Sequence, residues 1–241
     1  MTESFKDYRV SRSAIIFRKL FRPVFRGIFH LLSRVRIYGL ENVPARGAYL
    51  IAINHISIFE PPFILAFWPL APEAVGAVEI WERRGQSTLA RLYGGIPVHR
   101  GEYDRRIIDT MVSVLHSGHP LLIAPEGGRS HTPGMRAALP GVAYIIHRSK
   151  VPVIPVGIVG TTEDFLKRAL RGERRTLEMR IGGPLWLPEV AGRGKERRIA
   201  FQRNTDLIMH HIASLLPSEY RGVYAVSNID SIQAQERSYS I

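Results

Sequence analysis

The stretch that decides the fold is Ala48-Tyr-Leu-Ile-Ala-Ile-Asn-His-Ile-Ser-Ile-Phe-Glu60, which Pro61 follows directly. Residues 48–53 form a short apolar run with strand character. Residues 61–67 predict a helix, because proline is tolerated in the first helical turn. His55 therefore stands between a predicted buried strand and a helix start. Loops in this position are where open α/β sheets place their sites.

Strands and helices alternate along the rest of the chain in the same way. Apolar runs predict strands at 121–124, 151–159 and, more weakly, 177–181. Apolar residues at helical spacing predict helices at 87–93, 105–117, 142–147 and 199–216. Strands separated by helices of this length indicate an α/β fold, with a mostly parallel central sheet flanked by helices.

Composition restricts the classes of function. The 241 residues suffice for one large domain or two small ones, and the absence of cysteine excludes disulfides, thiolate metal sites and a cysteine nucleophile. We expect no secretory signal and no membrane span, since the longest uncharged runs fall short of the ~18 apolar residues a span needs. The net charge of +12 indicates a polyanionic partner: nucleic acid, phospholipid headgroups or a phosphorylated substrate.

The N-terminal segment is the most biased part of the chain. Residues 8–40 hold eight Arg or Lys and no acidic residue, and apolar side chains recur at spacings of three and four between Phe17 and Leu32. Pro23 predicts either a kink or the start of a second helix. Such a stripe can simply cover the core. We favour a helix in the membrane interface, with arginines reaching lipid phosphates. Nucleic acid is disfavoured because no established binding motif is present.

The simplest division of the chain follows from this bias. Residues 1–35 are predicted to be a basic amphipathic membrane-binding arm, and residues 36–226 an α/β domain. Residues 227–241 are predicted to be a polar, flexible tail.

His55 and Glu60 are the first candidates for chemistry. Across a turn into a helix start, side chains five positions apart can face one cleft. A carboxylate on one imidazole nitrogen fixes the tautomer, and the other nitrogen can then remove a proton from a hydroxyl. When such a pair is considered alone, it is more commonly a structural histidine followed by an unrelated glutamate, whose charge suits the start of a helix.

Two further segments pair glycine with a cation. In Ala124–Ser130, Gly127 and Gly128 let backbone amides approach an anion, and the Arg129 guanidinium suits a phosphate. Gly95–Arg100 likewise ends an apolar run on a basic residue. Either segment taken singly is more commonly a tight turn with a solvated arginine.

The order of these segments resembles a known family. Asn-His-x4-acid, Gly-x4-Arg, Pro-Glu-Gly-x-Arg-Ser and Val-Pro-Val-Ile-Pro-Val occur in the same order as the four blocks of the glycerolipid acyltransferases. The 1-acylglycerol-3-phosphate acyltransferases are the most similar type. The resemblance covers residues 36–160 well and the remainder loosely.

The resemblance implies a reaction and a set of site residues. His55, paired with Glu60, is expected to be the general base that lets an acceptor hydroxyl attack the thioester of acyl-CoA or acyl-carrier protein. The phosphate and glycerol of the acceptor are expected to bind Arg100, Glu126, Gly127, Gly128 and Arg129. The acyl side is expected to be formed by Val151, Pro152, Val153, Ile154 and Pro155. Neither a metal nor a cofactor is implied beyond the thioester co-substrate.

The expected product is phosphatidic acid, made from lysophosphatidic acid at the cytoplasmic face of the cell membrane by a peripheral or monotopic enzyme. The expected partners are the phospholipid surface, the two substrates and an acyl-carrier protein, and not nucleic acid. The alternatives are another lysophospholipid or a glycolipid as acceptor, or an inactive lipid-binding homologue.

Three departures from the family pattern bear on the site. Glu60 stands where the family usually has Asp, Gly128 where it usually has Thr, and Val98 near a usual aromatic or large apolar residue. They bear on the identity of the acceptor more than on the class of reaction.

Overall fold

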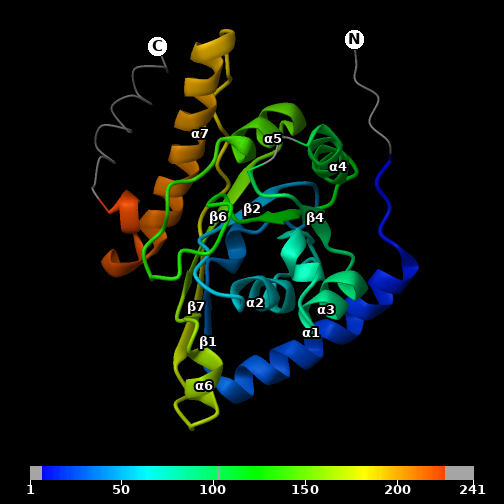
Figure 1. The fold of residues 1–241 in the computed structure, drawn as a ribbon, viewed down its shortest axis with the longest axis vertical. Coiled ribbons are helices and arrows are strands. Elements are labelled where there is room, and N and C mark those ends of the chain that lie inside the picture. The colour runs from blue at the N-terminus through cyan, green and yellow to red at the C-terminus, as the bar shows by residue number, and fades with distance from the viewer. Residues whose placement is uncertain (1–6, 102–103, 226–241) are drawn as a thin grey trace.

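A computed structural model describes residues 7–101 and 104–225 of the chain (Figure 1), so the predicted tail at 227–241 lies outside the described residues. Within them, seven strands form one sheet in the order β1-β7-β6-β2-β5-β3-β4. The strands are β1 (Arg34–Tyr38), β2 (Leu50–Ile53), β3 (Glu73–Ala77), β4 (Ile96–Val98), β5 (Leu121–Ile123), β6 (Val153–Val159) and β7 (Thr176–Ile181).

Helices occupy most of the connections between these strands, and one more helix precedes the first strand and another follows the last. They are α1 (Arg12–Leu32), α2 (Glu60–Phe67), α3 (Gln86–Tyr93), α4 (Arg105–His116), α5 (Gly141–Ser149), α6 (Phe165–Ala169) and α7 (Gly194–Leu215). The predicted α/β class is confirmed, and α2 to α5 lie where the sequence predicts helices. Three strands were not predicted. Of these, β1 alternates charged and apolar residues at the sheet edge, and β4 has three residues.

The sheet is mostly parallel, as expected. Strands β2 to β6 run in one direction, whereas β7 pairs antiparallel with β6 and parallel with β1. The central strand β2 is buried on both faces. Leu50 and Ala52 contribute to the core beneath α4, α5 and α7, while Ile51 and Ile53 contribute to the core on the side of α1 and α2. This is the alternation of side chains expected of a strand.

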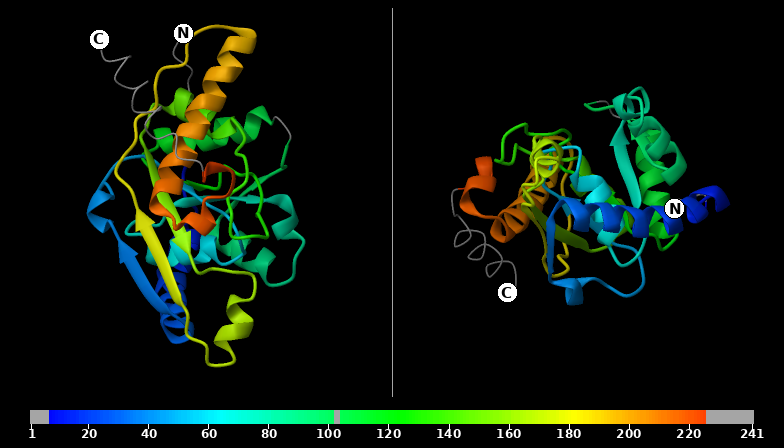
Figure 2. Two further views of the ribbon diagram at one scale, coloured as in Figure 1. Left: turned by 90° about the vertical axis from the view of Figure 1, so that its left-hand side faces the viewer. Right: turned by 90° about the horizontal axis from the view of Figure 1, so that it is seen from below.

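The N-terminal segment forms one continuous helix, α1, which passes through Pro23 without starting a second helix. It lies across the underside of the molecule, against α2 and α3 (Figure 2, right). Its inward phenylalanines pack on the core, with Phe21 stacked on Phe25 at 4.0 Å and Phe29 against Phe63 at 5.2 Å. The inner face of α1 therefore covers the core, which is the simpler of the two interpretations of its apolar stripe.

Three of its arginines are engaged inside the protein. Arg18 is 5% exposed and forms a bidentate ion pair with the buried Glu73, at 2.5 and 2.7 Å. Arg26 donates to the carbonyl of Ala66 at 2.7 Å, and Arg22 donates to carbonyls just beyond the end of α2. Because cations near a helix C-terminus offset its partial negative charge, Arg22 and Arg26 bind α1 to α2.

The outer face of α1 carries an apolar ridge. Its residues are spaced by four, four, four and three positions and are 41–73% exposed: Ile16, Leu20, Val24, Ile28 and Leu31. The stripe read from the sequence is therefore two adjacent surfaces, one packed and one exposed. Across residues 7–101 and 104–225, no helix combines the length and apolar character needed to cross a membrane.

Candidate active site

Four loops meet at the carboxyl edge of the parallel strands. His55 follows β2, Glu126 follows β5, Thr161 follows β6 and Arg100 follows β4. Because neighbouring parallel strands end at the same edge of the sheet, their following loops are brought together there. His55 lies between a buried strand and a helix start, as the sequence predicts.

His55 and Glu60 are in direct contact. His55 Nδ1 lies 2.9 Å from Glu60 Oε2, and the histidine side chain is 15% exposed. The imidazole Nε2 has no hydrogen-bond partner among the described residues. The glutamate is the first residue of α2, where Pro61 and Pro62 occupy the first turn. The sharp change from strand to helix therefore places the two side chains together despite the five-residue spacing.

Glu60 is fully buried and surrounded by donors. Its carboxylate accepts the backbone N–H of Ser57 at 2.9 and 3.0 Å, the Ser57 hydroxyl at 3.0 Å, and the hydroxyl of Thr161. All the other contacts of this carboxylate are with donors, and the His55 contact fits the same pattern when Nδ1 carries the ring hydrogen and donates it to Oε2. The extra methylene relative to Asp is thus accommodated, because the longer side chain spans from His55 to Thr161.

Asn54 fixes the end of β2 to the neighbouring strand. Its amide nitrogen donates to the carbonyl of Ile158 at 3.0 Å, and its oxygen accepts the Ile158 N–H at 2.7 Å. The side chain is completely buried and satisfied by both bonds. It therefore holds the loop that carries His55 against β6.

Glu126 is turned into the protein rather than toward an acceptor. One carboxylate oxygen accepts the backbone N–H of His55 at 2.9 Å, and the other accepts that of Arg136 at 2.8 Å. It is 4% exposed, and burial raises the pKa of its carboxyl, against the lowering effect of the two amides. Its position is that of a brace between two loops. The expected direct contact with glycerol is not supported by this geometry.

The two glycines serve different purposes. Gly127 has φ +66°, and its amide donates to the carbonyl of Ala124 within a turn rather than pointing free toward an anion. A Cβ on Gly128 would lie 3.5 Å from Arg136 Nη1 and 3.6 Å from Arg100 Nη1. The missing side chain at Gly128 therefore leaves space beside two guanidinium groups, of which only Arg100 was predicted.

Arg129 has an acidic partner. Its Nη1 lies 3.1 Å from Glu163 Oε1, and the same oxygen lies 2.8 Å from His131 Nδ1. The carbonyl of Arg129 accepts from Arg136 Nη1 at 3.2 Å. The amide of Ser130 donates to the carbonyl of His55 at 2.9 Å, so this basic segment is tied directly to the histidine loop.

The fourth block does not join these residues. Val153, Ile154 and Pro155 lie in the N-terminal half of β6 and are buried in the sheet, with Val151 and Pro152 just before it. Because β6 runs parallel to β2, with Leu50 opposite Val153, the first three of these residues (151–153) lie toward the opposite end of the strands from His55. Ile154 and Pro155 lie alongside the middle of β2 and are enclosed in the sheet. The expected acyl-binding role is therefore not supported by their placement.

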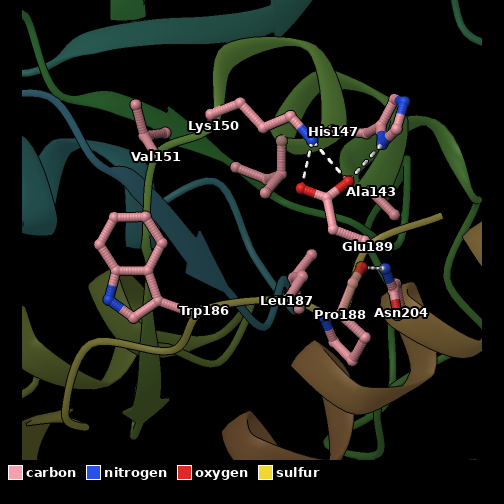
Figure 3. Close-up of a pocket in the computed structure, with 10 residues that line it drawn as sticks. Ala143, His147, Lys150, Val151, Trp186, Leu187, Pro188, Glu189 and Asn204 are labelled. Atoms are coloured by element: carbon pink, nitrogen blue, oxygen red, sulfur yellow. Dashed lines mark hydrogen bonds and ion pairs between the residues drawn. The ribbon is translucent and has the colours of Figure 1, made fainter.

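A pocket of about 220 Å³ lies at that opposite end (Figure 3). Val151 lines it together with the exposed Trp186, and Lys150 pairs there with Glu189 at 2.6 Å. It is separate from the His55 site.

Four residues of the site were not predicted: Ser57, Thr161, Glu163 and Arg136. Ser57 was identifiable in principle, since a hydroxyl three residues before a helix-start carboxylate can bond to it. Thr161 lies 101 residues from Glu60, and Glu163 lies 34 residues from Arg129. Their proximity depends on the sheet, and no local pattern signals it.

The sequence of the chain matches one protein family. The profile of the Acyltransferase family matches residues 34–159, which contain His55, Glu60 and all four blocks completely. The chain belongs to the acyltransferase family. The family match ends at the last residue of β6, so Thr161 and Glu163 lie just beyond it.

One curated protein and one solved structure are similar to the chain. A lyso-ornithine lipid O-acyltransferase from Pseudomonas aeruginosa is 29% identical over 149 residues, which cover 55% of this chain and 57% of that protein. The chain thus matches little more than half the length of this curated relative. The crystal structure of the 1-acyl-sn-glycerophosphate acyltransferase PlsC from Thermotoga maritima has a TM-score of 0.58 and 20% identity, covering 81% of this chain and 79% of the other. This second likeness supports the fold.

Proposed function

We propose that this acyltransferase moves a fatty acyl group from an acyl thioester, carried by coenzyme A or acyl-carrier protein, to the free hydroxyl of a lysolipid with an acidic headgroup. The observation that carries the proposal is the His55–Glu60 contact at 2.9 Å, in a loop that the Ser130 amide ties to the arginine-containing segment after β5. It provides a base for the hydroxyl and cations for the headgroup.

The reaction follows from the dyad. Nε2 of His55 removes the hydroxyl proton while the oxygen attacks the thioester carbonyl, and a new C–O bond forms. The C–S bond then breaks, and the thiolate takes the proton back from the imidazolium, so no covalent acyl-enzyme is needed. Glu60 holds Nδ1–H in place and stabilises the imidazolium, as the carboxylate of a catalytic triad does.

Two acceptors are candidates. The order of the four blocks favours lysophosphatidic acid, with phosphatidic acid as the product. The identity of 29% with a lyso-ornithine lipid acyltransferase favours an acceptor of that kind. Both have an acid that the guanidinium groups of Arg100, Arg129 and Arg136 can bind.

We further propose that the ridge on α1 rests in the interface of the membrane. Leu20 and Val24 are 63% and 57% exposed, and the charged side chain of Lys19 is exposed beside them. Exposed apolar side chains next to cations are typical of helices that lie on an anionic lipid surface. Peripheral attachment would bring the site to a lysolipid already in the bilayer.

Replacement of the base tests the proposed reaction. In His55→Ala, kcat for transfer from acyl-CoA to either lysolipid is expected to fall about 10²- to 10⁴-fold, the usual contribution of a general base. His119→Ala is a matched control, because His119 precedes β5 at the opposite end of the strands. The fold of both variants is checked by circular dichroism. Activity that survives in His55→Ala would rule out the proposed mechanism.

A second pair of variants tests the membrane contact. Leu20→Glu with Val24→Glu is expected to abolish co-sedimentation with vesicles that contain anionic phospholipid. Val223→Glu is the control, since Val223 is 65% exposed and lies in the C-terminal part of the domain. Unchanged binding by the double variant would contradict the role of the ridge.

A further inference from the structure

We infer that Glu163 selects an acceptor whose headgroup carries a cation as well as an acid. This inference rests on the proposed acyl transfer and concerns the chemical class of its acceptor. It begins from the pairing of Arg129, which was expected to bind phosphate, with a carboxylate of the protein itself.

Only one oxygen of Glu163 is used in this pairing. Oε1 receives both Arg129 Nη1 at 3.1 Å and His131 Nδ1 at 2.8 Å. Oε2 has no partner among the described residues, and the side chain is 51% exposed. An unpaired, exposed carboxylate oxygen of Glu163 therefore remains available to a ligand beside Arg129.

The position of Glu163 relates this oxygen to the reacting hydroxyl. Thr161, two residues earlier, donates to the dyad carboxylate of Glu60. Arg129 is followed by Ser130, whose amide bonds to the carbonyl of His55 at 2.9 Å. Glu163 is thus joined to both His55 and Glu60 by short chains of contacts, and its partner Arg129 belongs to the basic segment that follows β5.

The charges around the site are divided accordingly. The guanidinium groups of Arg100 and Arg136 approach the position of the missing Gly128 Cβ, where an acid can bind. Beside them, Glu163 partly neutralises Arg129 and repels a second negative charge. The Glu163 carboxylate attracts a positively charged group of the headgroup and repels an additional negative charge, while the arginines attract the acid. This arrangement therefore favours a zwitterionic headgroup over a doubly charged phosphate.

A matched pair of acceptors isolates the effect of the cation. Lysophosphatidylethanolamine and its N-acetyl derivative share the phosphodiester and the acyl chain, and differ in the ammonium group. We expect the wild-type protein to have a kcat/KM about three- to tenfold higher for the ammonium form, the range expected for a partly exposed charge pair. The difference is expected in KM, with kcat nearly equal.

Glu163→Gln is expected to reduce this ratio to about one, and Glu163→Asp, which keeps the charge on a shorter side chain, to restore part of it. Glu189→Gln is the matched control, since Glu189 is also an exposed, ion-paired glutamate but lies at the opposite end of the strands. Thermal unfolding checks that the variants are folded.

The outcomes separate the two levels of the proposal. If the wild-type protein has the same kcat/KM for both acceptors, or if Glu163→Gln leaves the ratio of the two kcat/KM values unchanged, the proposed role of Glu163 is overturned. The proposed acyl transfer would still stand. Equal loss toward both acceptors in Glu163→Gln would make the residue a support for Arg129 instead. Absence of transfer to any lysolipid would overturn the proposed reaction and this inference together.

Discussion

Shortening Glu60 by one methylene is the sharpest test of the dyad. In Glu60→Asp the carboxylate moves back by about 1.5 Å, the length of one C–C bond. The backbone at this position is the start of α2, with two prolines in its first turn, and cannot easily follow. A carboxylate that now reaches both His55 and Thr161 must then lose at least one of them.

The expected effects follow from these lost contacts. A misplacement of about 1 Å in a catalytic group costs about 10²-fold in rate, so kcat should fall by about that factor with KM nearly unchanged. Loss of the Thr161 bond to a charged acceptor costs about 1.5–3 kcal/mol, and the methylene removed from the core about 0.8 kcal/mol. The free energy of unfolding should therefore fall by about 2–4 kcal/mol.

Initial rates of thiol release from acyl-CoA, measured with varied lysolipid, separate kcat from KM. Urea unfolding gives the stability, and the rates are taken at a temperature where circular dichroism shows a folded variant. Glu41→Asp makes the same change at an exposed site and should behave as wild type. A Glu60→Asp protein with wild-type kcat would refute the reasoning, because the length of the side chain would then be irrelevant to the position of the base.

Three further changes have expected outcomes. Thr161→Val removes a donor to Glu60 and should lower kcat about tenfold with unchanged KM in the thiol-release assay, since a lost hydrogen bond to a charged group is worth about that factor. Arg18→Met leaves Glu73 buried without its partner and should reduce the free energy of unfolding in urea by about 3–5 kcal/mol. Burial raises the pKa of the Glu126 carboxyl in the folded protein. At pH values between the usual glutamate pKa and this raised pKa, the folded protein keeps a proton that the unfolded chain has released. The free energy of unfolding is therefore expected to fall as the pH rises through this range. In urea titrations at several pH values, Glu126→Gln should lose this slope, and an identical slope in both proteins would contradict it.

Local sequence indicated the contact between His55 and Glu60 as a candidate. A strand that ends at Ile53 and a helix start marked by Pro61 and Pro62 bring the two side chains together across a short loop, although they are five residues apart. The alternation of apolar runs likewise predicted the α/β class and a mostly parallel sheet. Each of these depends on neighbours in the chain, which is why pattern and spacing were enough.

Packing divided the apolar stripe of α1. Helical periodicity puts Phe21 and Leu20 on one broad face, and only the packing of α1 against its neighbours, with Phe21 against Tyr93 of α3, decides that the phenylalanine is buried and the leucine exposed. The same fit engages Arg22 and Arg26 at the end of α2 instead of leaving them for lipid. Composition showed the positive charge of this helix but not where each cation is used.

By itself, the sequence determined the α/β class, indicated Glu60 as the candidate carboxylate partner of His55, and located two basic, glycine-containing segments at 95–100 and 124–130. Only the tertiary structure decided three contacts: the Thr161 hydroxyl donates to Glu60, Glu126 accepts the backbone N–H groups of two loops, and Glu163 pairs with Arg129. The physical reason is the register of the sheet. Parallel pairing of β2 with β5 and β6 aligns their carboxyl ends, so residues up to 101 positions apart become neighbours at one edge.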